Sequence, residues 1–98
     1  MFSDNVQHTL NLISARLRSE RLARNEPQDR FAARLGISVP TLRRLEQGDP
    51  SAQIGHWLAA LEVLGRLQDT EALLAPRYSL FDAAAESPKT RQRARRRI

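Results

Sequence analysis

The sequence predicts an all-α fold of five helices around one core, and three observations lead to this expectation. Apolar residues recur at helical spacing, glycines and prolines fall between the resulting segments, and nothing in residues 1–75 alternates as a strand would. The chain has 98 residues, of which 41% are hydrophobic, so it is large enough for one small domain with a modest core.

The first predicted helix begins near residue 4 and ends near Asn25. Ser3 or Asp4 can cap its start, because a short polar side chain can accept a hydrogen bond from a backbone N–H of the first turn. Asn25 tolerates the left-handed conformation and stands just before Pro27, so we expect the helix to end there. Apolar residues at intervals of four, three and four form one face of an amphipathic helix: Val6, Leu10, Ile13 and Leu17.

Two short helices follow, and a glycine separates them. Residues 28–35 form the first and end at Gly36, and residues 39–47 form the second. Pro40 suits the first turn of a helix, where its missing N–H is not needed. Because the residue before a proline resists the helical region, Val39 favours a start one residue later.

The fourth and fifth helices are expected between Ser51, which can cap the fourth, and Pro76, which stops the fifth. The fourth ends at Gly65, and the fifth is a short helix over about 69–75. The fourth helix has a line of apolar residues: Ile54, Leu58, Leu61 and Leu64. Trp57 stands beside this line, and we expect it to be a core residue.

Charge divides the chain into a neutral domain, residues 1–75, and a basic extension, residues 76–98. The first part has nine Arg and nine acidic residues, whereas the second has seven basic residues against Asp82 and Glu86, which accounts for the net charge of +5. We expect residues 87–98 to be a flexible tail. This tail could follow a DNA backbone, dock on an acidic partner or only aid solubility, and the sequence leaves these alternatives open.

Several classes of function are not expected from this sequence. The chain has no cysteine, which excludes disulfides and thiolate metal sites, and His8 and His56 lack ligand-spaced partners. No nucleotide-binding or hydrolase motif occurs, so we expect no enzyme, no cofactor, no metal and no small-molecule substrate. The N-terminus lacks a signal-peptide pattern and no apolar stretch reaches membrane-span length, so we expect a cytoplasmic, bacterial-type protein that associates with the nucleoid and not with a membrane.

The most informative segment is 28–47, in which two helices meet across a short turn containing glycine. Ala32 has to be small because the helices touch there, and Gly36 can take the positive φ that the turn requires. Three leucines turn inward and hold the second helix against the first: Leu35, Leu42 and Leu45.

The opposite face of the 39–47 helix is then expected to point outward as a unit. It has the width to enter a DNA major groove, which accommodates one α-helix. The alternative is a helical hairpin in an unrelated bundle. Four residues form this outward face: Val39, Pro40, Arg43 and Arg44.

At these positions the chain resembles the Cro/cI-like (XRE) helix-turn-helix family. The resemblance covers about residues 10–75 and implies a five-helix lambda-repressor-like DNA-binding domain. The matching residues are Ala32, Leu35, Gly36, Ile37, Leu42, Leu45 and the ending Glu46-Gln47-Gly48.

The resemblance also implies roles for individual residues. Gln28 would bind a phosphate, and Arg43 and Arg44 would reach base edges, guanine above all. For the two arginines the alternatives are phosphate contact or simple solvation. The remaining implied contacts are two residues that anchor the start of the helix to backbone or base, Ser38 and Thr41, and two that touch a thymine methyl, Val39 and Pro40.

Two further features concern the frame around this helix. Many members of the family join an Arg of the first helix to the Glu that ends the third, and Arg21 and Glu46 hold those positions here, unless they are two unrelated surface charges. The chain departs from the family at Pro27, where a capping Ser, Thr or Asn is usual, which puts the placement of Gln28 in doubt.

The regulatory role has three alternatives, because the chain has no room for a sensor domain. The short extension looks like that of HipB-type antitoxins, which repress their own operon and bind a HipA-like kinase toxin. The others are a stand-alone repressor and a protein-interaction module that no longer binds DNA. In the antitoxin family a short C-terminal strand can pair between subunits, for which Tyr78, Leu80 and Phe81 are the candidates here, the alternative being an unstructured linker.

We also expect a homodimer on an inverted-repeat operator, since one helix in one groove gives weak specificity and two copies roughly double the contacts. Its interface would involve the fifth helix and residues 76–82.

Overall fold

The structure, a computed structural model, describes residues 2–77. Within this range the chain forms four α-helices, one 3₁₀ helix and no strand, which confirms the predicted all-α fold. The predicted strand at 78–81 and the predicted tail at 87–98 lie outside the described residues. The helices are α1 (Asp4–Ala23), α2 (Gln28–Leu35), α3 (Val39–Glu46), α4 (Ile54–Val63) and the 3₁₀ helix η1 (Leu67–Ala72).

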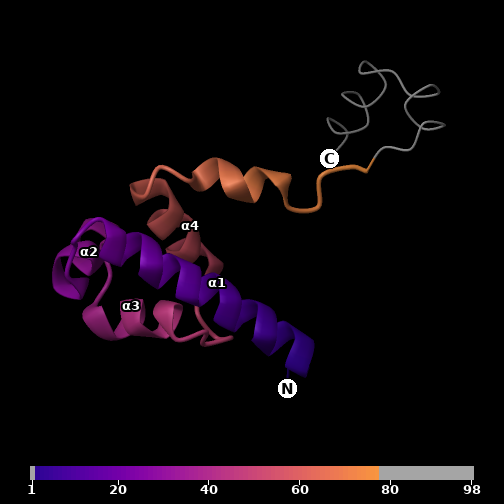
Figure 1. Cartoon of the computed structure of the whole chain (residues 1–98), viewed down its shortest axis with the longest axis horizontal. Helices are drawn as coiled ribbons and strands as arrows, with labels where there is room; N and C mark the ends of the chain where they lie inside the picture. The colour runs from indigo at the N-terminus through magenta and orange to yellow at the C-terminus, as the bar shows by residue number, and fades with distance from the viewer. Residues whose placement is uncertain (1, 78–98) are drawn as a thin grey trace, which may run out of the picture.

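Helix α1 is the central element, and the shorter helices lie on different sides of it (Figure 1). Helix α3 packs against α1 and α2, while α4 packs against α2 and η1. In Figure 1, α3 lies below α1, and η1 lies above it and leads out of the bundle. The long helix therefore presents one side to α3 and another to α4 and η1.

The core lies where α1, α2, α3 and α4 meet. Phe31, Leu42 and Leu45 are completely buried, and Leu35 and Trp57 pack against this centre as half-buried residues. Burying a large apolar side chain contributes about 1.5–3 kcal/mol each, so these residues hold α2 and α3 together. The buried apolar residues are Leu17, Phe31, Ala32, Leu42, Leu45, Ala60 and Leu64.

The ends of α1 follow the sequence-based expectations. Ser3 caps its start, with Oγ accepting a hydrogen bond from the N–H of Val6 at 3.2 Å. Asn25 follows its end with a φ of 53°, and the N–H of Glu26 donates to the carbonyl of Arg21 at 3.3 Å. This left-handed reversal satisfies carbonyls that the helix end would leave unpaired.

Helix α3 begins at Val39, so the expected one-residue delay before Pro40 is wrong. Ser38 caps this helix, with Oγ accepting from the N–H of Thr41 at 3.2 Å, and proline occupies the first turn, where no backbone donor is required. The cap therefore outweighs the local preference of the residue before a proline.

The expected cap of α4 is also wrong. Gln53, and not Ser51, precedes the helix, and no side chain caps it. The N–H and hydroxyl of Ser51 both donate to Oδ1 of Asp49, at 2.8 and 2.7 Å, so this serine belongs to the preceding turn.

The apolar line predicted for α4 is only partly buried. Leu64 is buried, but Ile54 is 67% exposed and Leu58 and Leu61 are half-buried. The fully buried residue of this helix is Ala60, which the apolar spacing did not include. A small side chain at a close contact gives a weak hydrophobic signal, which explains this difference.

The fifth helix is shorter and earlier than the predicted 69–75, and it is a 3₁₀ helix, η1. Its start is held by Arg66, whose guanidinium contacts Asp69 at 2.7 Å, and by the hydroxyl of Thr70, which donates to the carbonyl of Leu67 at 2.7 Å. Leu73 stands outside it, 68% exposed, because no described element packs over it.

The described residues include no helix with both the length and the apolar character to cross a membrane. They also contain no group of three or more His, Cys, Asp or Glu placed to hold a metal ion.

Candidate nucleic-acid interface

The turn between α2 and α3 depends on one glycine. Gly36 has a φ of 75°, its N–H donates to the carbonyl of Ala33 at 3.1 Å, and the N–H of Ile37 donates to that of Ala32 at 3.0 Å. These two bonds close α2 and turn the chain directly into α3. A Cβ at Gly36 would meet nothing within 4 Å, so the requirement for glycine comes from the backbone conformation alone.

The start of α3 is fixed by two hydroxyls. Ser38 Oγ and Thr41 Oγ1 lie 2.9 Å apart, in addition to the bond that Ser38 Oγ accepts from the backbone. Ser38 is exposed and Thr41 is half-buried. Both residues predicted to anchor this helix on DNA therefore lie at its first turn, where they already hold each other.

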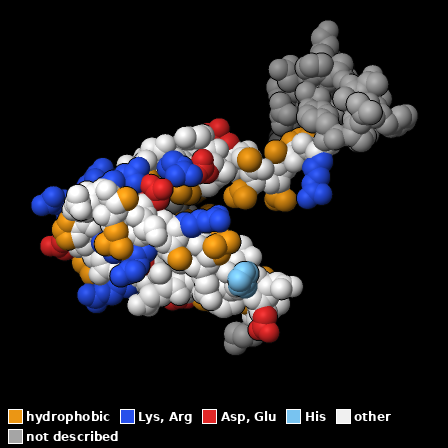
Figure 2. All heavy atoms as spheres, viewed as in Figure 1, with side chains coloured by type: hydrophobic (Ala, Val, Ile, Leu, Met, Phe, Trp, Pro, Cys, Tyr) orange, Lys and Arg blue, Asp and Glu red, His pale blue; other side chains and the backbone are white. Residues whose placement is uncertain are grey.

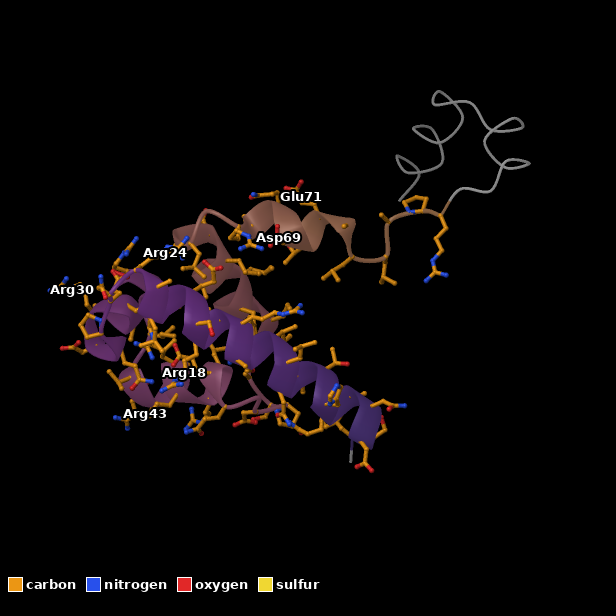
Figure 3. The ribbon with its side chains drawn as sticks, viewed as in Figure 1. Arg18, Arg24, Arg30, Arg43, Asp69 and Glu71 are labelled. Carbon is orange, nitrogen blue, oxygen red and sulfur yellow. The ribbon has the colours of Figure 1, made fainter. Side chains whose placement is uncertain are left out.

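The outward face of α3 contains three of the four predicted residues. Pro40, Arg43 and Arg44 are exposed, and Figure 3 shows Arg43 pointing away from the helical body. The prediction that Val39 points outward is wrong, because this side chain is half-buried against the core. It stands three residues before the buried Leu42 and so shares its inward face.

The end of α3 is clamped to α1 by a buried ion pair. Arg21 Nε lies 2.6 Å from Glu46 Oε2, and its Nη2 donates to Glu46 Oε1 at 3.0 Å. The two side chains are only 6% and 2% exposed, so they are not independent surface charges. Arg21 Nη1 also donates to the carbonyl of Glu26 at 2.9 Å, which joins the turn before α2 to the same clamp. A bidentate pair of this kind fixes orientation as well as distance.

Gln28 links this clamp to the exposed face, a connection that the sequence did not suggest. Its Nε2 donates to Glu46 Oε1 at 3.1 Å, and its Oε1 accepts from Arg43 Nε at 3.4 Å. Pro27 precedes α2 without a side-chain cap, as expected, and Gln28 is the first residue of the helix. A continuous chain of polar contacts therefore runs from Arg21 through Glu46 and Gln28 to Arg43.

The loop after α3 approaches α1 closely. The carbonyl of Gly48 accepts from Gln7 Nε2 at 2.8 Å, and a Cβ on this glycine would lie 2.5 Å from Asn11 Oδ1. Asp49, the residue after Gly48, accepts hydrogen bonds from Ser51. The bond from the Ser51 backbone N–H, followed in effect by the bond from its hydroxyl, holds the pKa of Asp49 below its ordinary value. The loop is therefore built from specific polar contacts that set the far end of α3.

Sequence reasoning missed two exposed arginines, of which Arg18 borders this face. Arg18 stands on α1 between two residues of its α3 side, Ser14 and Arg21, and Arg30 stands on the neighbouring α2. Figure 3 shows Arg18 and Arg43 on the α3 side of α1 and Arg24 on the opposite side.

Basic side chains gather around α2 and α3 in the space-filling view (Figure 2). Among the described residues four arginines form salt bridges with acids: Arg21, Arg24, Arg34 and Arg66. Three arginines near this face, together with Arg30 on α2, have no acid partner among residues 2–77: Arg18, Arg43 and Arg44. The sequence signal for these residues was the number of arginines on the predicted helices, but only the fold shows which arginines pair with an acidic residue.

A family model described as a helix-turn-helix domain matches residues 12–74, which include most of α1 and all of α2, α3, α4 and η1. No curated protein and no solved structure matches the chain.

Proposed function

This chain belongs to the helix-turn-helix domain family, a family of DNA-binding regulators, and from that premise we propose that it is a sequence-specific transcriptional repressor without enzymatic activity. The observation that carries the proposal is the fixed and exposed position of α3. Ser38 caps its start, the pair Arg21–Glu46 clamps its end, and Arg43 and Arg44 lie exposed between them. An element held at both ends places its side chains reproducibly against base edges.

The size of α3 suits a major groove. This groove is about 12 Å wide, and an α-helix with its side chains is about 10–12 Å across. Arg43 and Arg44 would donate to guanine O6 and N7, while Pro40 would contact a thymine methyl. Arg18, at the border of the face, would reach a phosphate and help to set the register on the duplex.

Gln28, Ser38 and Thr41 have a supporting role in this proposal. Each can contact the DNA backbone, but each also holds part of α3 in place through its present hydrogen bonds. Gln28 can give one amide hydrogen to a phosphate while the other stays on Glu46, since a side-chain amide has two donors. Contact with DNA would then be coupled to the position of Arg43.

The proposed unit on DNA is a homodimer that reads an inverted repeat, with half-site centres about 34 Å apart. We place its interface on η1 and residues 76–82, with Tyr78, Leu80 and Phe81 as the contact residues. The support from the described residues is the exposure of apolar side chains beside this segment, 68% for Leu73 and 102% for Leu74.

We further propose that the regulator is the antitoxin of a HipBA-like operon, which represses its own promoter in the cytoplasm and binds a HipA-like kinase toxin. The charged segment that follows its helix-turn-helix domain, residues 76–98, favours this role. The alternative, a stand-alone regulator of the XRE type, is equally consistent with the domain. A HipA-like gene beside this one and co-purification of its product would favour the antitoxin, whereas their absence would favour the stand-alone regulator.

DNA binding is tested by selecting duplexes from a random library with the purified full chain and then measuring retardation of the recovered sequence. We expect an inverted repeat with guanine in both half-sites. Recovery of no enriched sequence, together with no retardation of the chain's own promoter, would show a protein-interaction module instead.

A further inference from the structure

A groove of about 640 Å³ lies between α1, α4 and η1, on the side of α1 away from α3. Its walls are mainly apolar. They are formed by α1, by α4 and by the residue that directly follows η1: Leu10, Ile13, Trp57, Leu58, Leu61 and Leu73. Figure 2 shows hydrophobic side chains on both sides of the hollow that separates α1 from the segment around η1. The DNA-binding proposal uses none of these residues.

Several of the apolar side chains in and beside the groove are too exposed to solvent to be core residues. Ile13 is 37% exposed and Leu73 is 68% exposed, while Leu74 is fully exposed and has a φ of 56°. A leucine in the left-handed region is uncommon, and here no described neighbour packs on it. Contiguous exposed apolar surface of this kind marks an interaction site.

We propose that this groove binds residues 78–81 of a second copy of the chain. The inference rests on the proposed homodimer and names the surface that its contact segment meets. Tyr78, Leu80 and Phe81 supply three large apolar side chains within four residues, and within residues 78–98 the only other large apolar side chain is Ile98. The apolar segment and the apolar groove therefore match in character.

The lengths also agree. The part of α1 that lines the groove runs from Leu10 to Glu20, which is about 15 Å at the helical rise of 1.5 Å per residue. Four residues in extended conformation span about 13 Å. The segment is thus long enough to fill the groove and short enough to stay within it.

The course of the chain favours a second copy as the source. Leu73 lines the groove, and beyond it the chain continues out of the bundle up to Arg77, the last described residue (Figure 1). In a two-fold dimer each copy offers both the segment and the groove, so the contact forms twice. Asp82, next in sequence, would then come near Arg16, which lines the groove and has no acid partner among residues 2–77, whereas Arg66 already pairs with Glu20 and Asp69.

Cysteine cross-linking tests this arrangement directly, because the full chain contains no cysteine. The variant carrying Ile13→Cys and Leu80→Cys is treated with a short bismaleimide and separated on a denaturing gel. We expect a covalent dimer, and also a covalent heterodimer when separate Ile13→Cys and Leu80→Cys chains are mixed. The matched control, Ile13→Cys with Ala84→Cys, is expected to cross-link at least five-fold less.

A cross-linked species of monomer mass would show that the segment folds back on its own groove, and no cross-link above the control would show that the groove is not its site. Either result overturns the proposal. Retardation of the selected DNA by the same variants is measured separately, so that a failure of groove docking is distinguished from a failure of DNA binding.

A second measurement avoids chemical modification. Trp57, the single tryptophan, lines the groove, so its emission reports on the occupant. Leu80→Asp is expected to shift the emission to the red and to raise the dimer dissociation constant at least ten-fold, whereas Ala84→Asp adds the same charge and should change neither. Equal behaviour of the two variants would contradict the docking of this segment.

Discussion

The two sides of α1 differ in how completely they are packed. On the side that faces α3, directed polar contacts hold the helix: Gln7 bonds the loop at Gly48, and Arg21 holds Glu46 in a buried ion pair. On the side that faces α4 and η1, Leu10 and Ile13 line an open apolar groove. The first side fixes one helix in one orientation, while the second leaves apolar surface for an occupant.

This difference indicates where orientation matters to the molecule. Hydrogen bonds and ion pairs have directions, so they position α3 and, through Gln28, the side chain of Arg43. Apolar contacts have no direction and tolerate a range of occupants. If this comparison is right, changes to the polar contacts should alter stability or DNA binding, whereas changes on the other side of α1 should leave α3 in place.

The largest expected effect comes from removing one partner of the buried ion pair. Glu46→Ala leaves the Arg21 guanidinium buried without its carboxylate, so the free energy of unfolding should fall by about 3–5 kcal/mol. The control is Arg24→Ala, which removes the exposed pair with Glu20 and one hydrogen bond to the carbonyl of Leu64, and it should cost less, about 1–2 kcal/mol. Chemical denaturation measures both, and equal small losses would mean that the clamp does not hold α3.

A smaller effect is expected at the link between the clamp and the exposed face. Gln28→Ala should weaken binding to the selected DNA by about 1 kcal/mol, and its effect should not add to that of Arg43→Ala. A double-mutant cycle by binding titration gives the coupling between the two residues. Strict additivity would show that Gln28 acts on DNA independently of Arg43, as a simple phosphate contact.

One substitution on α1 should stabilise the protein. Ser14 is 1% exposed, and its hydroxyl has no hydrogen-bond partner among the described residues. Because a buried unsatisfied hydroxyl is unfavourable and alanine is the better helix former, Ser14→Ala should raise the free energy of unfolding by about 1 kcal/mol. Urea denaturation measures the change, and a loss of stability would reveal a partner for this hydroxyl.

The smallest effect concerns acid stability. A side-chain hydrogen bond from Arg24, with the charges of Arg24 and Arg66, lowers the pKa of Glu20. A group whose pKa is lower in the folded state stabilises the fold above its unfolded pKa, and this contribution is lost as the pH falls through the folded value. In the Glu20→Gln variant, the free energy of unfolding should therefore fall slightly less steeply as the pH drops below about 4.3. Thermal unfolding from pH 6 to pH 3 checks this, and an unchanged slope would contradict it.

Local patterns predicted most of the fold. The bounds of α2 and the reversals at Asn25 and Gly36 depend on neighbouring residues, and the structure has them where the sequence placed them. The start of α4 and the form of η1 were predicted incorrectly, because Ser51 is used by Asp49 and because Arg66 and Thr70 hold an earlier, tighter turn.

The site was less predictable because it is made by residues distant in sequence. Arg43 and Arg44 could be placed on an exposed face from spacing alone, but Val39 could not, since its burial depends on how α3 sits on the core. The contact between Gln28 and Arg43 joins residues 15 apart in sequence on two helices. The groove is likewise a product of packing, because α4 is apolar on most sides and its spacing did not select which residues face inward.

The central claim is that α3 is held out so that its arginines read DNA, and a titration of the selected duplex with Arg43→Ala and Arg44→Ala tests it most directly. Each variant should lose about 1–3 kcal/mol of binding free energy and part of its preference for guanine in the half-site. Arg24→Ala, on the opposite side of α1, should bind as the unaltered chain does. If all three variants bind with the affinity and preference of the unaltered chain, α3 is not the recognition helix.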